Sequence, residues 1–267
     1  MRTISLAILL LFAINSQAAA PTGSFNSNQC IDCHQKNNSA LITDWKKSRH
    51  AQTKPTASCI GCHGKQHSNA AASSRKNKSC INCHGGKQSP LVHSYLNSKH
   101  GAILRMEQHT YDWQQPLANA NYRAPGCAYC HMHQGNHDAD IQQNKKNKQS
   151  GNKIISGANF AVCRDCHSPR YINRLRENGN RMINVAQMKF NEASKLISTA
   201  KQSYTKKQLQ PALDQLNTMN KHLNNVYLGA VHQSPDYQWW HGQPALDGDL
   251  LKIKGVLGDL ERMEKLK

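Results

Sequence analysis

The sequence predicts a mainly α-helical protein, with short helices and loops in its N-terminal part and long helices in its C-terminal part. Two observations carry this fold class. Five cysteine motifs begin at intervals of 29, 21, 47 and 36 residues, and these gaps leave little room for sheets. From about residue 171 there are no cysteines, and apolar residues recur at helical spacing.

Three apolar stripes predict three C-terminal helices with buried faces. In chain order the stripes are Met182, Val185, Met188, Leu196 and Ile197; Leu209, Leu213, Leu216, Leu223, Val226 and Ala230; and Leu250, Ile253, Leu257, Leu260 and Met263. Pro211 is expected in the first turn of the second helix, where proline is tolerated. The third helix is expected to follow a turn at residues 247–249. Two polar stretches, 66–79 and 142–153, are expected to be exposed loops.

Residues 1–20 have the features of a secretory signal peptide. Arg2 supplies a positive charge, residues 6–14 are an apolar run, and small residues near Ala18 and Ala20 offer cleavage sites. The apolar run is too short to span a bilayer comfortably, so cleavage is favoured over an uncleaved anchor. We therefore expect an exported, periplasmic protein with no transmembrane segment in the mature chain. The domain organisation expected is a cofactor-binding region at 21–170 and a helical region at 171–267 that packs on it.

All ten cysteines fall into five pairs of one form, in which two residues separate the cysteines and a histidine follows the second. The cysteines are Cys30 and Cys33, Cys59 and Cys62, Cys80 and Cys83, Cys127 and Cys130, and Cys163 and Cys166, and the histidines that follow are His34, His63, His84, His131 and His167. Histidine fills 15 of 267 positions. Finding it after all five pairs by chance has odds on the order of one in a million, so the pattern is a motif.

This spacing is typical of covalent haem c attachment. Each of the two vinyl groups of a haem forms a thioether with one cysteine, and a helix-like turn sets the two sulfurs at the required separation. The adjacent histidine then binds the iron as its proximal ligand. A zinc site needs four ligands per metal and no histidine after each pair. A redox dithiol would need one pair rather than five. The sequence therefore predicts five covalently attached haems.

Haem also accounts for the composition. Only 38% of the residues are hydrophobic, so the side chains alone supply little core. We expect the haem-free chain to be largely unfolded.

The formal net charge is +18, and removal of Arg2 with the signal leaves +17. Five oxidised haems, each about −1 with its propionates, bring the charge to about +12. An acidic redox partner or an anionic substrate fits this positive charge better than nucleic acid does.

Ten further histidines are available as second axial ligands, and imidazole serves well in that role. His50 and His100 each follow a motif histidine by 16 residues, in the elements Ser48-x-His50 and Ser98-x-His100. The distal candidates are His50, His67, His100, His133, His137, His222 and His232. His93, His109 and His241 are the first histidines to be left out of the set of distal ligands.

Several elements together resemble the hydroxylamine oxidoreductase family of octahaem cytochromes. They are Arg123-Ala-Pro-Gly-Cys127-Ala-Tyr-Cys130-His131-Met132 with Gly135-Asn-His137, Cys62-His63-Gly64-x-x-His67, Ser98-x-His100-Gly101, Asp112-Trp113 and Pro235-Asp-Tyr237-x-Trp239-Trp240. The Trp45-x-x-Ser48-x-His50-Ala51 element is shared more widely among multihaem cytochromes. The resemblance runs from about residue 30 to 245.

The resemblance implies haems packed in alternating parallel and perpendicular pairs, bis-histidine ligation for most of them, and a helical C-terminal region. In octahaem relatives one haem is open and handles hydroxylamine, nitrite or related nitrogen species. It implies that His100 lies near such a haem or ligates its neighbour, and that Tyr237 is the counterpart of a tyrosine cross-linked to the catalytic haem. The chain departs from the family in having five motifs instead of eight. It also lacks the lysine variant of the motif found in pentahaem nitrite reductases.

Three functional hypotheses follow. The favoured one is an electron-transfer cytochrome with mostly bis-histidine haems that exchanges electrons with a redox partner protein or a quinol-linked cytochrome. The second is an enzyme in which one open haem binds a small nitrogen or sulfur species and His100 or Tyr237 takes part in catalysis. The third is a haem-bearing subunit whose long helices contact other copies, as in a homo-oligomer.

Overall fold

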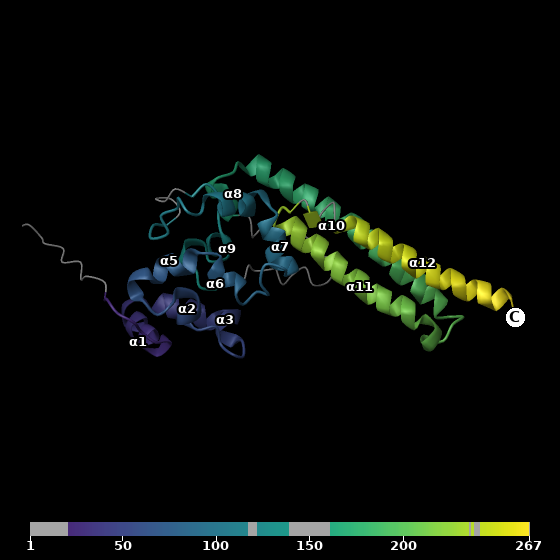
Figure 1. Cartoon of the computed structure of the whole chain (residues 1–267), viewed down its shortest axis with the longest axis horizontal. Coiled ribbons are helices and arrows are strands. Elements are labelled where there is room, and N and C mark those ends of the chain that lie inside the picture. The colour runs from purple at the N-terminus through teal and green to yellow at the C-terminus, as the bar shows by residue number, and fades with distance from the viewer. Residues whose placement is uncertain (1–20, 117–121, 139–160, 235, 238–240, 267) are drawn as a thin grey trace, which may run out of the picture.

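The computed structural model describes residues 21–116, 122–138, 161–234, 236–237 and 241–266 (Figure 1). The expected signal peptide, the loop expected at 142–153, and Pro235, Trp239 and Trp240 lie outside these residues. The mainly α-helical fold is confirmed. Within the described residues, extended pairing is limited to one isolated bridge between Ser24 and Gln66. No described helix is both long and apolar enough to cross a membrane.

The part of the chain that carries the motifs folds into short helices, which gather at one end of the molecule (Figure 1). These are α1 (Ser27–Asn37), α2 (Ser39–Lys47), α3 (Arg49–Gln52), α4 (Cys59–His63), η1 (His67–Asn69), α5 (Ala70–Arg75), α6 (Lys78–Ile81), α7 (Pro90–Leu96), α8 (Lys99–Glu107), α9 (Cys127–His131), η3 (His133–Gly135) and η6 (Val162–Asp165). Among its described residues, few apolar side chains are buried, and the largest cluster of buried ones consists of Leu104, Tyr111 and Ala124.

The loop expected at 66–79 is wrong, because this stretch forms η1, α5 and the start of α6. The stretch is polar, but Ala70 to Ala72 favour a helix, and Ala72 is buried. Ser79 Oγ donates to the Ser73 carbonyl at 2.7 Å and ties the next helix to α5. Local hydrogen bonding thus orders a segment whose composition indicates a loop.

Three long helices form a bundle that extends away from the short ones (Figure 1). They are α10 (Pro169–Ala200), α11 (Lys206–Val231) and α12 (Gln243–Lys265). The helices α10 and α12 run in the same direction, since Lys189 Nζ pairs with Asp247 at 2.7 Å and Lys254 Nζ pairs with Glu192 at 2.6 Å. The helix α11 contacts both and also packs on α7. The bundle therefore meets the motif-bearing region where α11 packs on α7 and where α10 contacts η6.

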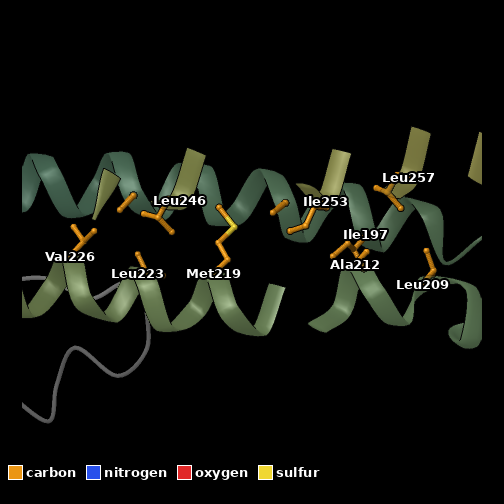
Figure 2. Close-up of a cluster of buried hydrophobic side chains, with 11 residues drawn as sticks. Ile197, Leu209, Ala212, Met219, Leu223, Val226, Leu246, Ile253 and Leu257 are labelled. Carbon is orange, nitrogen blue, oxygen red and sulfur yellow. The ribbon is translucent and has the colours of Figure 1, made fainter. Parts of the chain in front are cut away.

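The three predicted C-terminal helices are confirmed, with corrections to their details. The core between them contains Ile197, Leu209, Met219, Leu223, Val226, Leu246 and Ile253 (Figure 2). On α10 the buried face instead runs through Ile183, Ala186, Ala193 and Ile197. The side chains of Val185 and Met188, which the predicted stripe placed in the core, are exposed, as is that of Met263 on α12.

The expected positions of Pro211 and of the turn before the last helix are also wrong. Pro211 is the sixth residue of α11, beyond the first turn, and the helix continues through it. The turn expected at 247–249 is helical, because α12 begins at Gln243, with Pro244 in its first turn. Asp249 is 3% exposed, and its carboxylate accepts hydrogen bonds from Gln215 Nε2 and His222 Nδ1, both at 2.6 Å. Of the two acidic residues that indicate a turn in the sequence, Asp249 thus joins α12 to α11, and Asp247 joins α12 to α10 through Lys189.

Candidate functional site

Each cysteine motif lies on one turn of helix, as the spacing predicts. Three motifs lie within α1, α4 and α9, a fourth starts in α6 and a fifth in η6. Even where α6 is short, the turn closes, because the His84 amide donates to the Cys80 carbonyl at 3.0 Å. In such a turn, residues three and four apart share a face, so both thiols and the next imidazole face the same side.

Each of the five motif histidines faces a second histidine from another part of the chain. We number the pairs after the motif: pair I is His34 with His67, pair II His63 with His137, pair III His84 with His50, pair IV His131 with His232, and pair V His167 with His100. Their ring centroids lie 6.4, 6.0, 6.1, 6.5 and 6.0 Å apart in that order.

These separations fit one iron between two imidazoles. An imidazole nitrogen binds a first-row metal at about 2 Å, and the ring centre lies roughly 1 Å further away, so ligands on opposite faces of a haem have centroids about 6 Å apart. The donor set is also correct for haem c, with two thiols on the turn that carries one imidazole of each pair. The described residues therefore fit five haem c groups.

In pairs III and V, a serine N-cap positions the facing histidine. Ser48 and Ser98 are fully buried N-caps of α3 and α8, and their hydroxyls accept from the amides of Ala51 at 3.3 Å and Gly101 at 3.1 Å. The same hydroxyls donate to carbonyls three residues earlier, at 2.6 and 2.7 Å. Each cap therefore fixes the first turn of a helix whose second residue is the histidine.

Gly101 shows how tightly the start of α8 packs against the end of α7. A Cβ at this position would lie 2.2 Å from the Tyr95 carbonyl oxygen, which belongs to the end of α7. Only glycine allows α8 to start against α7 at this point. The Ser98-x-His100-Gly101 element thus fixes both the cap and the close approach of the two helices.

The other three facing histidines come from different settings. His67 begins η1, His137 follows η3, and His232 ends α11. His137 Nδ1 donates to the Gly135 carbonyl at 2.8 Å, and His232 Nδ1 donates to the Leu228 carbonyl at 2.9 Å. His63, a motif histidine, donates in the same way to the Ala70 carbonyl at 3.1 Å. A carbonyl can only accept, so Nε2 of each of these imidazoles is left free to bind a metal.

Burial keeps several of these imidazoles neutral. Burial lowers the pKa of His63, His100 and His131, and the facing histidine of each pair lowers it further. The pKa of His131 falls to about 4. Burial also lowers the pKa of His232, although its bond to the Leu228 carbonyl acts in the opposite direction. A neutral imidazole is the form that binds a metal.

The remaining candidate ligands, His133 and His222, do not face a motif histidine. His133 Nε2 lies 2.8 Å from Asp165, which also accepts a hydrogen bond from the Tyr129 hydroxyl. His222 binds Asp249 within the bundle. The three histidines that the sequence analysis set aside also lie outside the pairs. His93 and His241 share the Asp236 carboxylate, at 2.8 and 2.5 Å, and His109 is exposed.

Tyr237, considered as a catalytic residue, lies away from the pairs in its described contacts. Its ring contacts that of His93, with centroids 5.4 Å apart. His100, the other residue considered, belongs to pair V and faces His167. The sequence therefore named all ten members of the pairs, but it also named His133 and His222. The carboxylate partners of these two are remote in sequence, so local context could not separate them from the histidines that face a motif histidine.

Consecutive motifs lie next to one another in space. As free thiols, Cys59 and Cys62 have pKa values raised by burial. The nearby thiol of Cys30 raises the pKa of Cys59 further. The thiols of Cys80 and Cys83 do the same to the pKa of Cys62. A hydrogen bond from Cys80 lowers the pKa of the Cys127 thiol. Burial, followed by Cys163 and Cys166, raises the pKa of Cys130 to about 12. The attachment sites thus form a continuous series from the first motif to the fifth.

Asn77 and Gly126 join the third and fourth motifs. The Asn77 side chain oxygen accepts from the Cys127 amide at 2.8 Å, at the start of α9. A Cβ on Gly126 would lie 2.6 Å from that same oxygen. The residue before the fourth motif must therefore be small for this contact to form.

Comparisons with known proteins agree with this geometry. Residues 47–206 match the family model described as "Seven times multi-haem cytochrome CxxCH". The fold resembles a chain of the reducing HAO-like protein complex of Kuenenia stuttgartiensis, with a TM-score of 0.57 and 18% sequence identity. The match covers 90% of this chain and 86% of that one.

Proposed function

Because this chain belongs to the multihaem c-type cytochromes and has the fold of a HAO-like protein, we propose that it transfers electrons through five bis-histidine haems. Haem c supplies an iron that alternates between the ferric and ferrous states. The cysteine pairs of the chain would attach it, and the two histidines of each pair would hold its iron and exclude water. Pairs I to V assign ten of the 15 histidines to this role.

The observation that carries the proposal is that all five motif histidines face a second imidazole. The centroid separations span only 6.0 to 6.5 Å, although the facing histidines come from four different kinds of local setting. A haem with two strong axial ligands is low-spin and has no free position for a substrate, which suits electron transfer. The contact between consecutive motifs supports stepwise transfer along the series.

The proposal includes export and a redox partner. Residues 1–20 would act as a cleaved signal peptide, and haem attachment would take place in the periplasm. Residues 21–170 would hold the haems and residues 171–267 would support them. The excess of basic residues favours an acidic redox partner protein, or a quinol-linked cytochrome that presents an acidic surface.

Low-temperature EPR of the oxidised holoprotein tests this function. We expect only low-spin ferric signals, unchanged by nitrite or hydroxylamine, because each iron has two imidazole ligands. A high-spin signal that shifts on addition of either molecule would contradict the proposal and favour an enzyme with an open haem.

A matched pair of variants sharpens the test. In His100→Gly, one haem in five should become high-spin, since pair V loses its facing ligand. In His109→Gly, which changes an exposed histidine outside the pairs, all haems should stay low-spin. Identical spectra for both variants would show that His100 is not an axial ligand.

A further inference from the structure

The five pairs differ in the angle between their imidazole planes. The angle is 15° in pair II and 19° in pair I. It is 38° in pair IV and 39° in pair V. In pair III the two rings cross at 76°. Pair III therefore stands apart from the other four.

This angle has an electronic consequence for an iron held between the rings. The π orbital of each imidazole overlaps with one of two iron dπ orbitals. Parallel rings act on the same dπ orbital and raise its energy above the other, so an electron is removed more easily. Crossed rings act on different orbitals, which stay close in energy. Parallel rings thus lower the reduction potential relative to crossed rings.

In pair II, hydrogen bonds to the outer ring nitrogens also lower the reduction potential of the iron. Both of its imidazoles donate Nδ1–H to backbone carbonyls, His63 to Ala70 at 3.1 Å and His137 to Gly135 at 2.8 Å. Such a bond makes the imidazole a stronger electron donor and stabilises ferric iron. In pair I, by contrast, His67 Nδ1 is buried and has no partner among the described atoms. Pair II therefore combines the smallest angle with hydrogen bonds on both rings.

On the His50 side of pair III, hydrogen bonds fix the backbone that carries the ring. The His50 carbonyl accepts from the Ala57 amide at 2.9 Å and from the Thr53 hydroxyl at 3.0 Å. The Trp45 indole donates to the Ala57 carbonyl at 3.3 Å and ties the same loop to α2. Together with the Ser48 cap, these bonds fix the turn from which the His50 ring projects.

Pairs II and III belong to consecutive motifs whose thiols lie close together. Building on the function proposed above, we infer that His63 and His137 on one side, and His50 and His84 on the other, create a step in reduction potential between the second and third haems. Pair II holds the haem of lowest potential, and pair III holds a neighbour of higher potential. One electron leaves the iron of pair II, which is oxidised, and reduces the iron of pair III.

An EPR-monitored redox titration of the unmodified holoprotein tests this inference. Crossed rings give a low-spin signal with an unusually large maximum g value, and parallel rings give a rhombic signal. We expect the large-g signal to account for one haem in five. On stepwise reduction it should be lost before the rhombic signal of pair II, which should persist to the lowest potential.

Two variants assign the signals. His50→Gly should lose the large-g signal, and His137→Gly should lose the rhombic signal that titrates last, each with the gain of one high-spin haem. The control His109→Gly should keep every signal. The inference is overturned if the large-g signal is absent, survives in His50→Gly, or titrates below the signal lost in His137→Gly. If the unmodified protein is low-spin throughout but lacks the large-g signal, only the step in reduction potential is contradicted. A high-spin signal in the unmodified protein contradicts the proposed function itself.

Discussion

Ser48 and Ser98 show how single residues position the candidate iron ligands. Each serine is buried, caps a helix and holds a histidine two residues later against a motif histidine. Its role is visible only when the cap, the helix start and the facing ring are seen together.

Ser98→Ala should lower the free energy of unfolding by about 1 kcal/mol, the usual cost of removing an N-cap. It should also change the EPR signal of one haem, since His100 loses its fixed position. Thr205→Ala is the control, because Thr205 caps α11 by accepting from the Gln208 amide at 3.4 Å, at the end of that helix opposite His232. This control should lose similar stability in chemical denaturation and keep its EPR spectrum. A changed spectrum in both variants would contradict the positioning role.

Asn77 and Gly126 offer a second prediction at the residue scale. Gly126→Ala places a methyl group against the Asn77 oxygen and should displace the start of α9. We expect a loss of stability of about 1–3 kcal/mol, as for other overpacked positions. Gly248→Ala is the control, since a Cβ there meets nothing within 4 Å and alanine favours the helix. Thermal unfolding of both variants measures the difference, and equal melting temperatures would refute the contact.

At the scale of elements, the three-helix bundle has a core that does not depend on haem. Met219 is fully buried between α11 and its neighbours, with Leu223 and Leu246 close by (Figure 2). Met219→Ala should cost about 2–5 kcal/mol and leave the haem spectra unchanged. Met188→Ala, at an exposed position of α10, should change stability by less than about 0.5 kcal/mol. Denaturation followed by circular dichroism compares the two variants.

Asp236 connects α7 to the segment between α11 and α12, because its carboxylate binds both His93 and His241. Burial raises its pKa, but the hydrogen bonds from His93 and His241 outweigh this, so the pKa lies below the usual value of 3.8. The stability that this carboxylate contributes is therefore present above about pH 4 and is lost as the pH falls through the lower pKa of the folded state.

Asp236→Asn should accordingly lower the melting temperature at pH 6, and the difference from the unmodified protein should shrink as the pH approaches 3. Melting curves recorded across this range provide the measurement. A difference that stays constant with pH would show that the carboxylate charge does not hold the two elements together.

The sequence predicted the motif turns and the long helices because both depend on local spacing. It missed the helices in residues 66–79 and the true start of α12, since polar composition there hides contacts made with other elements. It placed Val185 and Met188 in the core, because a single apolar stripe cannot show which face a neighbouring helix covers. The partner of each motif histidine was beyond local reasoning, since His63 and His137 are 74 positions apart.

At the scale of the whole molecule, the pairs join segments that are distant in sequence. Pair II links α4 to the segment after η3, and pair IV links α9 to the end of α11. Each haem held in this way would crosslink two parts of the fold. The short helices have little apolar core of their own, so these links replace much of the packing that a domain of this size needs.

This arrangement refines the expectation for the haem-free chain. Hydrogen exchange should find residues 21–116 and 122–138 unprotected without haem, while α10, α11 and α12 keep protected amides through their own core. With haem attached, both regions should be protected. Strong protection of the short helices in the haem-free chain would show that haem is not what holds them.

The most direct measurement of the central claim is a crystal structure of the holoprotein with anomalous scattering data collected at the iron edge. We expect five iron peaks, each between the two imidazoles of one pair and each beside the cysteines of one motif. An iron peak with an imidazole on one side only, or fewer than five peaks at full occupancy, would contradict it.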